Sequence, residues 1–550
     1  MTTKLYTLPL FLLLTCFFVV GCKKTAPPEP AAQVVSIDPS FLNVAKSLAY
    51  SYQLKATVAN GSGSNQITWS SENPRIATVT ASGLVMCIAA GETNIVATLS
   101  GGTAVAKCKV TVSDGDDYKY RLVLKDKGTS AYSISSPGEF LSARAIERRR
   151  KRNIPIDQSD LPISPDYIKA IQNVGGIIVA KSKWLNTVSI NTSDELSIDK
   201  YKTLPFVKDV ILVWEGKRST GSLTKYVDAP QAGNNQTANG PLDYGTALNN
   251  ISVSNGQALH DKGFRGAGIE IADIDAGFIN LKTNPAFNNI NIKGAKSFVY
   301  EQPDPYSTDD HGVWVTSCMA VNKPGFYVGT APEASYWLLH TEDQTSEYPI
   351  EEDYWANAIE YADSAGVDIV NSSLSYTTGY YLPSARYKFE DMDGKTALAS
   401  RAANMAFSKG IFIVCSAGNE QQWVGTPADS PNVLTVGSIN KTFNIDSFSS
   451  WGITVDGRVK PDIVALGGGA SVINNTGVQE PRSGTSYASP IICGLAACLW
   501  QAYPKLNNKE LMDVIRKSAD RYNNPIMPYG YGIANMQKAM DLAKVVSDSK

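Results

Sequence analysis

From about residue 250 to about residue 545, short apolar runs alternate with segments whose apolar residues recur at helical spacing. The runs "GIEIADID" and "GIFIVCS" have the length and composition of buried strands, whereas "HGVWVTSCMA" and "SYASPIICGLAACLW" have the spacing of buried helices. Strands that alternate with helices pair as a parallel sheet, and the helices cover its faces. We therefore expect an α/β domain over residues 250–545, with its site at the carboxyl ends of the strands.

The chain has 550 residues, which is too many for a single hydrophobic core, so the sequence predicts several domains. Residues 34–113 contain short alternating strands separated by turn residues, which is typical of a small β-sandwich. Residues 118–216 mix strands and helices and predict a small α/β domain. Residues 217–249 are poor in apolar residues and rich in glycine, asparagine, threonine and serine, so we expect a linker there.

The N-terminus has the features of an export signal, which we place at residues 1–21. Lys4 precedes an apolar run, ending at Val20, that is shorter than a typical membrane-spanning helix. The run leads into "VVGC", which resembles the lipobox of bacterial lipoproteins, so Cys22 is the expected lipidation site. The alternative is a plain secretory signal with a chance cysteine. Residues 22–33 are rich in proline and alanine and predict a spacer.

The charge balance gives no sign of a polyanionic partner. The net charge is −2, so we expect no binding of nucleic acid. Residues 144–152 contain a basic cluster that suits a nucleic-acid patch, a dibasic processing site or a solvated helix face. We favour the solvated face, because it accounts for the composition without a ligand. The cluster consists of Arg144, Arg148, Arg149, Arg150, Lys151 and Arg152.

Six cysteines remain beyond Cys16 and Cys22, and none has the CxxC spacing of a metal site. Six cysteines in an exported chain of this length are too few for a disulfide scaffold. Cys87 and Cys108 suit either a disulfide or two free thiols. The other four lie in apolar runs, where we expect them to be buried as small hydrophobic residues: Cys318, Cys415, Cys493 and Cys498.

Four segments of the C-terminal domain contain groups suited to acyl transfer: Asp275, His311, Asn419 and Ser486. A serine hydroxyl needs a neutral imidazole to take its proton, and the imidazole needs a carboxylate that fixes its tautomer. An asparagine amide and the serine N–H can donate hydrogen bonds to the oxyanion of a tetrahedral intermediate. Taken singly, Asp275 is equally a turn residue after a strand, and Ser486 is equally a helix N-cap.

Three of these residues stand in the order Asp–His–Ser, and six motifs surround them: "ADIDAGF", "DHGVWVTS", "NSSLSY", "SAGNE", "GRVKPDIVALG" and "SGTSYASP". In these motifs residues 250–545 resemble the subtilisin-like serine endopeptidases. The resemblance implies a catalytic triad of Asp275, His311 and Ser486, with Asn419 in the oxyanion hole. It also implies that no cofactor is required, and it allows structural calcium without assigning its ligands.

Three positions depart from the family pattern. Ala276 stands where the family usually has serine or threonine, and Val313 where it usually has threonine. Asp273 stands where an apolar residue is usual, and a buried carboxylate without a partner is costly. We therefore expect Asp273 to have a partner, to bind a cation or to be partly exposed. The acidic residues before His311 suit either calcium or a solvated loop: Glu301, Asp304, Asp309 and Asp310.

The resemblance extends to substrate binding. "NSSLSY" is similar to the strand with which the family pairs an extended peptide through main-chain hydrogen bonds. Ser375 replaces a glycine of the family, so we expect its side chain at the pocket entrance. The resemblance implies that two segments line the pocket for the residue before the scissile bond, namely Ser373, Leu374 and Ser375 on one side and Ser416, Ala417 and Gly418 on the other.

Two further resemblances concern the N-terminal domains. "ITWSSENPRIATVTASGLV" is similar to bacterial Ig-like domains of group 2, which predicts a stalk or, as the alternative, an adhesive module. Residues 118–216 precede the protease where the family carries an inhibitory propeptide that assists folding. We expect a propeptide there, and the alternative is a permanent accessory domain.

Together these features predict an exported, lipid-anchored serine endopeptidase of the bacterial cell envelope, with protein or peptide substrates and a membrane contact through Cys22. We expect it at the outer membrane or cell surface, with release by self-cleavage in the linker. Two alternatives stay open: a non-enzymatic surface binding protein on a degenerate protease fold, and an esterase on the same triad. The oligomeric state is not predicted.

Overall fold

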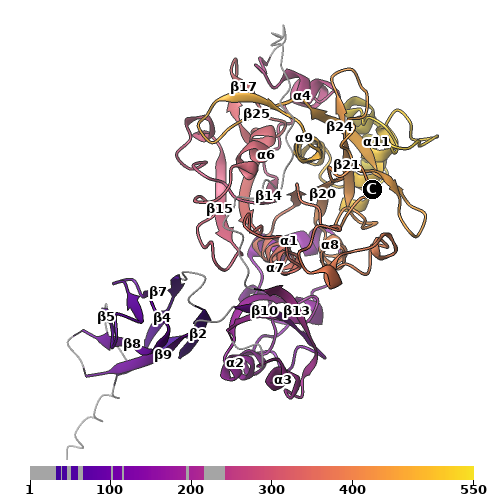
Figure 1. Cartoon of the computed structure of the whole chain (residues 1–550). Helices are drawn as coiled ribbons and strands as arrows, with labels where there is room; N and C mark the ends of the chain where they lie inside the picture. Colours follow the sequence, from indigo (N-terminus) through magenta and orange to yellow (C-terminus); the bar gives the residue numbers. More distant parts are fainter. Residues whose placement is uncertain are drawn as a thin grey trace, which may run out of the picture.

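Figure 1 shows the computed structural model, which describes residues 33–38, 40–45, 51–59, 66–100, 103–113, 117–193, 197–215 and 242–550. The predicted signal peptide, the lipidation site Cys22 and most of the predicted linker lie outside the described residues. No helix within these ranges is both long enough and apolar enough to cross a membrane.

The N-terminal domain is a small β-sandwich, which confirms the prediction from its alternating strands. Its strands span Val34–Asp38 (β1), Phe41–Ala45 (β2), Ser51–Gln53 (β3), Lys55–Ala59 (β4), Ile67–Ser71 (β5), Ala77–Val79 (β6), Leu84–Cys87 (β7), Gly91–Leu99 (β8) and Val105–Ser113 (β9). One sheet has the order β2-β9-β8-β5 and another β3-β7-β6, while β1 pairs with β4. Cys108 and Val110 are buried between exposed lysines, as the period of two requires. Cys87 and Cys108 are both free thiols.

The second domain, here called the small α/β domain, covers the described residues from 117 to 215. Its strands are β10 (Tyr118–Leu124), β11 (Ile177–Ser182), β12 (Thr187–Thr192) and β13 (Val207–Glu215). They form an antiparallel sheet in the order β11-β12-β10-β13. The helices α2 (Pro165–Val174) and α3 (Ser197–Lys202) pack against one face of this sheet (Figure 1). The helix α1 (Ala143–Lys151) instead lies beside the next domain.

The C-terminal domain covers residues 242–550 and is built on a seven-stranded sheet. The strands are β14 (Glu270–Asp275), β15 (Asn291–Ser297), β18 (Ser335–His340), β19 (Ile369–Ser372), β20 (Phe412–Ser416), β21 (Leu434–Asn440) and β24 (Ile463–Gly468). Their order is β15-β18-β14-β19-β20-β21-β24, and every neighbouring pair is parallel. The predicted parallel sheet is therefore confirmed. All residues of β19 and β20 are buried, because helices cover both faces.

One layer of helices contains α6 (His311–Ala320), α9 (Thr485–Ala502), α10 (Asn508–Ser518) and α11 (Met536–Asp548), which share a hydrophobic core with the sheet. The opposite face is covered by α7 (Ile350–Ala365) and α8 (Leu398–Ser408). Two short helices, α4 (Leu248–Ser252) and α5 (Gln257–His260), precede the first strand. Three two-stranded hairpins complete the domain: β16 (Asn322–Lys323) with β17 (Tyr327–Val328), β22 (Gly452–Ile453) with β23 (Val459–Lys460), and β25 (Ala470–Ile473) with β26 (Gln479–Arg482).

The last residues of the predicted linker at 217–249 belong to this domain. Tyr244 is 3% exposed, and its hydroxyl lies 3.1 Å from His260 Nδ1. Gly245 forms a backbone bridge with Tyr327, and α4 begins at Leu248. Residues 242–249 therefore pack as part of this domain, because apolar side chains such as Tyr244 dock this stretch.

The basic cluster at 144–152 is not a solvated helix face. Arg148 and Arg149 are only 4% and 1% exposed, whereas Arg150 and Lys151 are exposed. The two buried guanidinium groups both form ion pairs with Asp363 of α7. The prediction of a solvated face was wrong for these two residues, because α1 packs against another domain.

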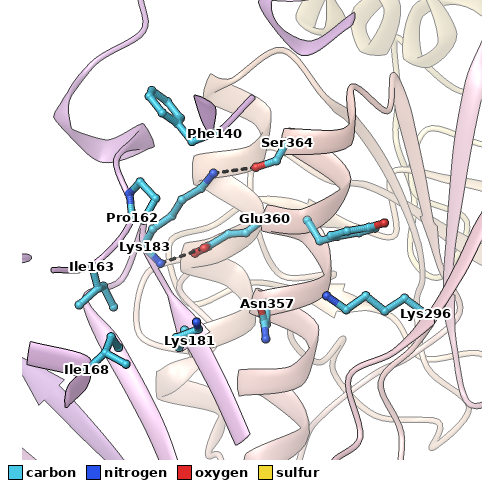
Figure 2. Close-up of a pocket in the computed structure, with 11 residues that line it drawn as sticks. Phe140, Pro162, Ile163, Ile168, Lys181, Lys183, Lys296, Asn357, Glu360 and Ser364 are labelled. Carbon is cyan, nitrogen blue, oxygen red and sulfur yellow. Dashed lines mark hydrogen bonds between the residues drawn. The ribbon is translucent and has the colours of Figure 1, made fainter. Parts of the chain in front are cut away.

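A second set of contacts joins the sheet of the small α/β domain to α7. Arg121 on β10 donates from Nε to Asp353 Oδ1 at 2.7 Å. The backbone N–H of Lys183 donates to Glu360 Oε2 at 2.9 Å, and its Nζ donates to Ser364 Oγ at 2.8 Å. Figure 2 shows these two contacts beside a pocket between the domains. The acidic face of α7 is thus covered by basic and polar groups of the small α/β domain.

Candidate active site

Asp275 and His311 meet at the carboxyl edge of the seven-stranded sheet. Asp275 is the last residue of β14, and His311 is the first residue of α6. His311 Nδ1 lies 2.6 Å from Asp275 Oδ1, which also accepts a hydrogen bond from the backbone N–H of Ala276 at 2.7 Å. Both side chains are at most 1% exposed. The carboxylate favours the tautomer with its proton on Nδ1, so Nε2 is the basic nitrogen of the neutral ring.

The start of α6 fixes the position of the imidazole. The backbone N–H of His311 donates to Asp309 Oδ1 at 2.8 Å. The His311 ring lies 6.3 Å from the rings of both Trp314 and Tyr487, measured between centroids. Since Tyr487 follows Ser486 in the chain, the imidazole lies next to the start of α9. The fold thus brings Asp275, His311 and Ser486 to one edge of the sheet.

Ser486 is the second residue of α9 and is 3% exposed. The N-cap of this helix is Gly484, so the alternative interpretation of Ser486 as the N-cap residue is contradicted. Pro490 has no N–H to donate to the carbonyl of Ser486 four residues earlier. Ser373 supplies the missing donor, because its Oγ lies 2.9 Å from the Ser486 carbonyl oxygen. The backbone of Ser486 is therefore anchored to the end of β19.

Asn419 follows β20 and is held by the residue before Ser486. Its Oδ1 accepts hydrogen bonds from the backbone N–H and the hydroxyl of Thr485, both at 2.9 Å. The Thr485 hydroxyl oxygen in turn accepts from the backbone N–H of Gly418 at 3.2 Å. Because the carbonyl end of the side chain is occupied by Thr485, the NH₂ group of Asn419 is the end that can donate into the pocket it shares with Ser486.

A pocket joins most of the predicted site residues. Asp275, His311 and Ala417 do not line it, and Ala417 is fully buried behind the surface. Glu342 and Glu347 line it although no motif in the sequence marks them, and Glu420 lines it as the last residue of the "SAGNE" motif. The complete lining consists of Glu342, Glu347, Ser373, Leu374, Ser375, Ser416, Gly418, Asn419, Glu420 and Ser486.

Asp273 is fully buried, which excludes the expectation that it is partly exposed. It instead has hydrogen-bonding partners, as another of the three expectations stated. Thr316 Oγ1 donates to its Oδ2 at 2.7 Å, and Asn371 Nδ2 donates to its Oδ1 at 2.9 Å. Burial, followed by the charge of Asp275, raises the pKa of Asp273. Asn371 also accepts from Ser489 Oγ at 2.8 Å. The network therefore ties β14, α6, β19 and α9 together beneath the site.

The other two histidines lie outside this arrangement. His260 is 1% exposed, and its Nε2 lies 3.0 Å from the carbonyl oxygen of Thr330. Burial lowers the pKa of His260 to about 4. His340 Nδ1 lies 2.9 Å from Ser297 Oγ. Both rings act as hydrogen-bonding groups of the fold.

Three of the acidic residues before His311, namely Glu301, Asp304 and Asp309, contact donors of the protein itself. Glu301 forms an ion pair with Lys119 of the small α/β domain. Asp304 Oδ1 accepts from the backbone N–H of Tyr306 at 3.0 Å. Across the ranges that the structure describes, no three His, Cys, Asp or Glu side chains are grouped as they would be around a metal ion.

Three family models match successive parts of the chain. Residues 31–110 match the bacterial Ig-like domain (group 2), and residues 119–225 match the peptidase S8 propeptide domain of Bacteroidota. Residues 258–533 match the subtilase family. These matches confirm the Ig-like, propeptide and subtilisin-like folds expected from the sequence motifs.

Known relatives align with the C-terminal half of the chain. Subtilisin E of Bacillus subtilis (strain 168) is 30% identical over 296 residues, which is 52% of this chain and 70% of that protein. Subtilisin of Bacillus pumilus is 29% identical over 296 residues, which is 52% of this chain and 97% of its own length. M-protease of Shouchella clausii (strain KSM-K16) is 28% identical over 291 residues, which is 52% of this chain and 68% of that protein. With these relatives, a matching family model and a parallel sheet of the expected form, the chain belongs to the subtilase family and is a subtilisin-like serine-type endopeptidase.

Proposed function

We propose that Ser486, His311 and Asp275 form the catalytic triad of this endopeptidase. His311 Nε2 takes the proton of the Ser486 hydroxyl as Oγ attacks the carbonyl carbon of the scissile peptide bond, and Asp275 stabilises the imidazolium. His311 then gives the proton to the leaving amine, and a water molecule hydrolyses the acyl-enzyme by the same route. The proposal rests chiefly on the 2.6 Å contact between His311 Nδ1 and Asp275 Oδ1.

Asn419 Nδ2 and the backbone N–H of Ser486 are the proposed oxyanion donors. Two observations support this role: Asn419 shares a pocket with Ser486, and its carbonyl oxygen is bound by Thr485. The Ser486 N–H lies in the first turn of α9, where backbone N–H groups have no helical acceptor. Loss of one such donor costs about 100- to 1000-fold in kcat.

Substrates are proteins or peptides bound in extended form along the segment from Ser373 to Ser375. Ser416 and Gly418, which flank the buried Ala417, form the other side of the pocket for the residue before the scissile bond. Ser375 and Gly418 support this assignment because both line the pocket beside Ser486. The proposed chemistry uses side chains, the backbone N–H of Ser486 and water, so no cofactor is required. Any structural calcium is left without assigned ligands.

The chain is proposed to be exported and lipid-anchored at Cys22, with the bacterial cell envelope as its location. Residues 1–21 are then the signal peptide, 22–33 a spacer and 34–113 an Ig-like stalk. Residues 118–216 act as the propeptide, and the protease at 250–545 is released by its own cut within 217–249. The export features of the sequence and the Ig-like and propeptide matches support this order.

Immunoblotting of membrane and soluble fractions tests this topology. Wild type should yield a protease fragment of about 300 residues, separate from the membrane-bound N-terminal part, because the cut is proposed within residues 217–249 of the 550-residue chain. Ser486→Ala should stay one full-length chain in the membrane fraction. Cys22→Ala combined with Ser486→Ala should move that full-length chain out of the membrane fraction. An active wild type that stays full-length would contradict self-release.

A further inference from the structure

The pocket beside Ser486 is acidic. Three of the ten residues that line it are glutamates. Glu342 and Glu347 come from the loop between β18 and α7, whereas Glu420 comes from the segment after β20, directly after Asn419. Among the ten lining residues, all of which the structure describes, none is basic. Negative charge therefore gathers where the proposed nucleophile lies.

Hydroxyl groups hold two of these carboxylates at the pocket. Tyr376 donates from its hydroxyl to Glu342 Oε1 at 2.6 Å. Ser450 Oγ donates to Glu420 Oε2 at 3.2 Å, and this oxygen lies so close over Gly418 that a Cβ there would be 2.6 Å from it. A neutral hydroxyl donor orients a carboxylate but does not cancel its charge. The carboxylates are thus positioned without being neutralised by these two hydroxyls.

The charges also act on one another. Loss of solvation raises the pKa of Glu420, and the nearby charge of Glu347 raises it further. Like charges gathered in a cleft attract a ligand of opposite charge and favour its binding. A primary ammonium or a guanidinium group is the peptide side-chain chemistry that meets this requirement.

We infer that this pocket takes the side chain of lysine or arginine at the position before the scissile bond, so that the enzyme cuts proteins after basic residues. The inference deepens the proposed function and rests on it, because it takes Ser486 as the nucleophile. A large apolar side chain would bring the glutamates an apolar neighbour that offers them no hydrogen bond, which is costly. An acidic side chain would be repelled.

Measurement of kcat/KM on a matched set of internally quenched peptides tests the inference. The enzyme is prepared by expressing the full chain and allowing it to process itself. The peptides differ only before the scissile bond, where they carry lysine, norleucine, leucine or glutamate. Norleucine keeps an unbranched stem like that of lysine and removes the ammonium group. We expect kcat/KM for the lysine peptide to exceed that for norleucine by about tenfold or more, with glutamate slowest. Faster cleavage of the norleucine or leucine peptide would overturn the inference.

Amide substitutions test the glutamates themselves. In Glu347→Gln and Glu420→Gln, the ratio of kcat/KM for the lysine peptide to kcat/KM for the norleucine peptide should fall about tenfold. Glu333→Gln is the matched control, because Glu333 precedes the amino end of β18 and pairs with Arg265 at 3.6 Å, away from the carboxyl edge of the sheet. It should leave both peptides unchanged. Equal losses on the lysine and norleucine peptides in both pocket variants would assign the glutamates a structural role and overturn the inference.

A neutral fluorophosphonate separates this inference from the proposed function, because it reacts with an activated serine without needing a basic side chain. Labelling at Ser486 without a preference for lysine would overturn the inference alone. Folded wild-type protein that is neither labelled nor able to cleave any of the four peptides would overturn the proposed function.

Discussion

Arg149 and Asp363 form an ion pair across the boundary between the propeptide domain and the catalytic domain. Arg149 Nη2 donates to both carboxylate oxygens of Asp363, at 2.9 and 2.7 Å. The two side chains are 1% and 0% exposed, and Arg148 contacts the same carboxylate. Because all three groups are buried, removal of the carboxylate leaves two guanidinium groups without their shared partner.

Asp363→Asn should therefore weaken the contact between the domains. Loss of one partner from a buried ion pair costs about 3–5 kcal/mol. We expect amide hydrogen exchange in α7 to accelerate in full-length Ser486→Ala protein that also carries this substitution. Glu147→Gln is the control, because Glu147 pairs with Arg150 on the exposed side of α1 and should not change the exchange. Unchanged exchange in Asp363→Asn would show that the pair does not hold the domains together.

The two aspartates of β14 should differ sharply in function. Asp275→Asn removes the acceptor of the His311 Nδ1 proton, so kcat should fall about a thousandfold or more. Asp273→Asn should keep most of the activity, because Thr316 and Asn371 can hydrogen-bond an amide as they do the carboxylate. Initial rates on one peptide, with circular dichroism as the check on folding, compare the two variants. A silent Asp275→Asn beside an inactive Asp273→Asn would reverse the assignment of the catalytic carboxylate.

Asp273 should also make stability depend on pH. Burial and the charge of Asp275 raise its pKa in the folded state to about 8, so the folded protein binds this proton more tightly than the unfolded chain. The resulting stability is complete below the unfolded pKa of about 4 and is lost as the pH rises through the folded pKa. An amide does not ionise. The melting temperature of Asp273→Asn should therefore rise relative to that of the protein with Asp273 as the pH increases from 5 to 8. Both proteins need the Ser486→Ala background to prevent self-digestion, and a difference independent of pH would contradict the prediction.

Self-cleavage should occur after a basic residue if the acidic pocket selects one. The predicted linker at 217–249 contains three such residues, and all lie near its start: Lys217, Arg218 and Lys225. N-terminal sequencing of the released protease should therefore find Ser219 or Tyr226 as the first residue, or Arg218 itself. Replacing the three residues by glutamine should leave the chain full-length. Processing of that triple variant at the wild-type rate would contradict the prediction.

Much of the fold follows from patterns that are local in the sequence. β20 is buried on both faces, and its sequence FIVCS is a short, mostly apolar run that can be recognised alone. β19 is equally buried, but its sequence IVNS is half polar and gives a weaker signal. Asp275 and His311 stand at the end of a strand and the start of a helix, and in a parallel sheet such positions share one edge. Their proximity could therefore be expected before any coordinates.

The acidic face of α7 could not be expected in the same way. Glu351, Glu352, Asp353, Glu360 and Asp363 are all buried, although such a helix has the composition of a solvated surface. Asp353 is covered by Arg121, which lies 232 positions away in the chain. Burial of a charge depends on where its partner lies in space, and no local pattern encodes that. Glu342 and Glu347 were also missing from the predicted pocket. They lie in a loop without a motif, and only the folded chain brings that loop beside Ser486.

The most direct test of the account is reaction of Ser486 with a neutral fluorophosphonate, followed by peptide mapping of the labelled residue and assay of the same samples on a peptide library. The wild type should be labelled at Ser486 and should cleave peptides, and Ser486→Ala should lose both the label and at least about a thousandfold of the rate. Ser483→Ala is the matched control, because Ser483 lies in the same segment and its Oγ accepts a hydrogen bond from the backbone N–H of Gly469 at 3.0 Å. It should keep both the label and the activity. A folded Ser486→Ala protein that cleaves peptides at the wild-type rate would contradict the central claim.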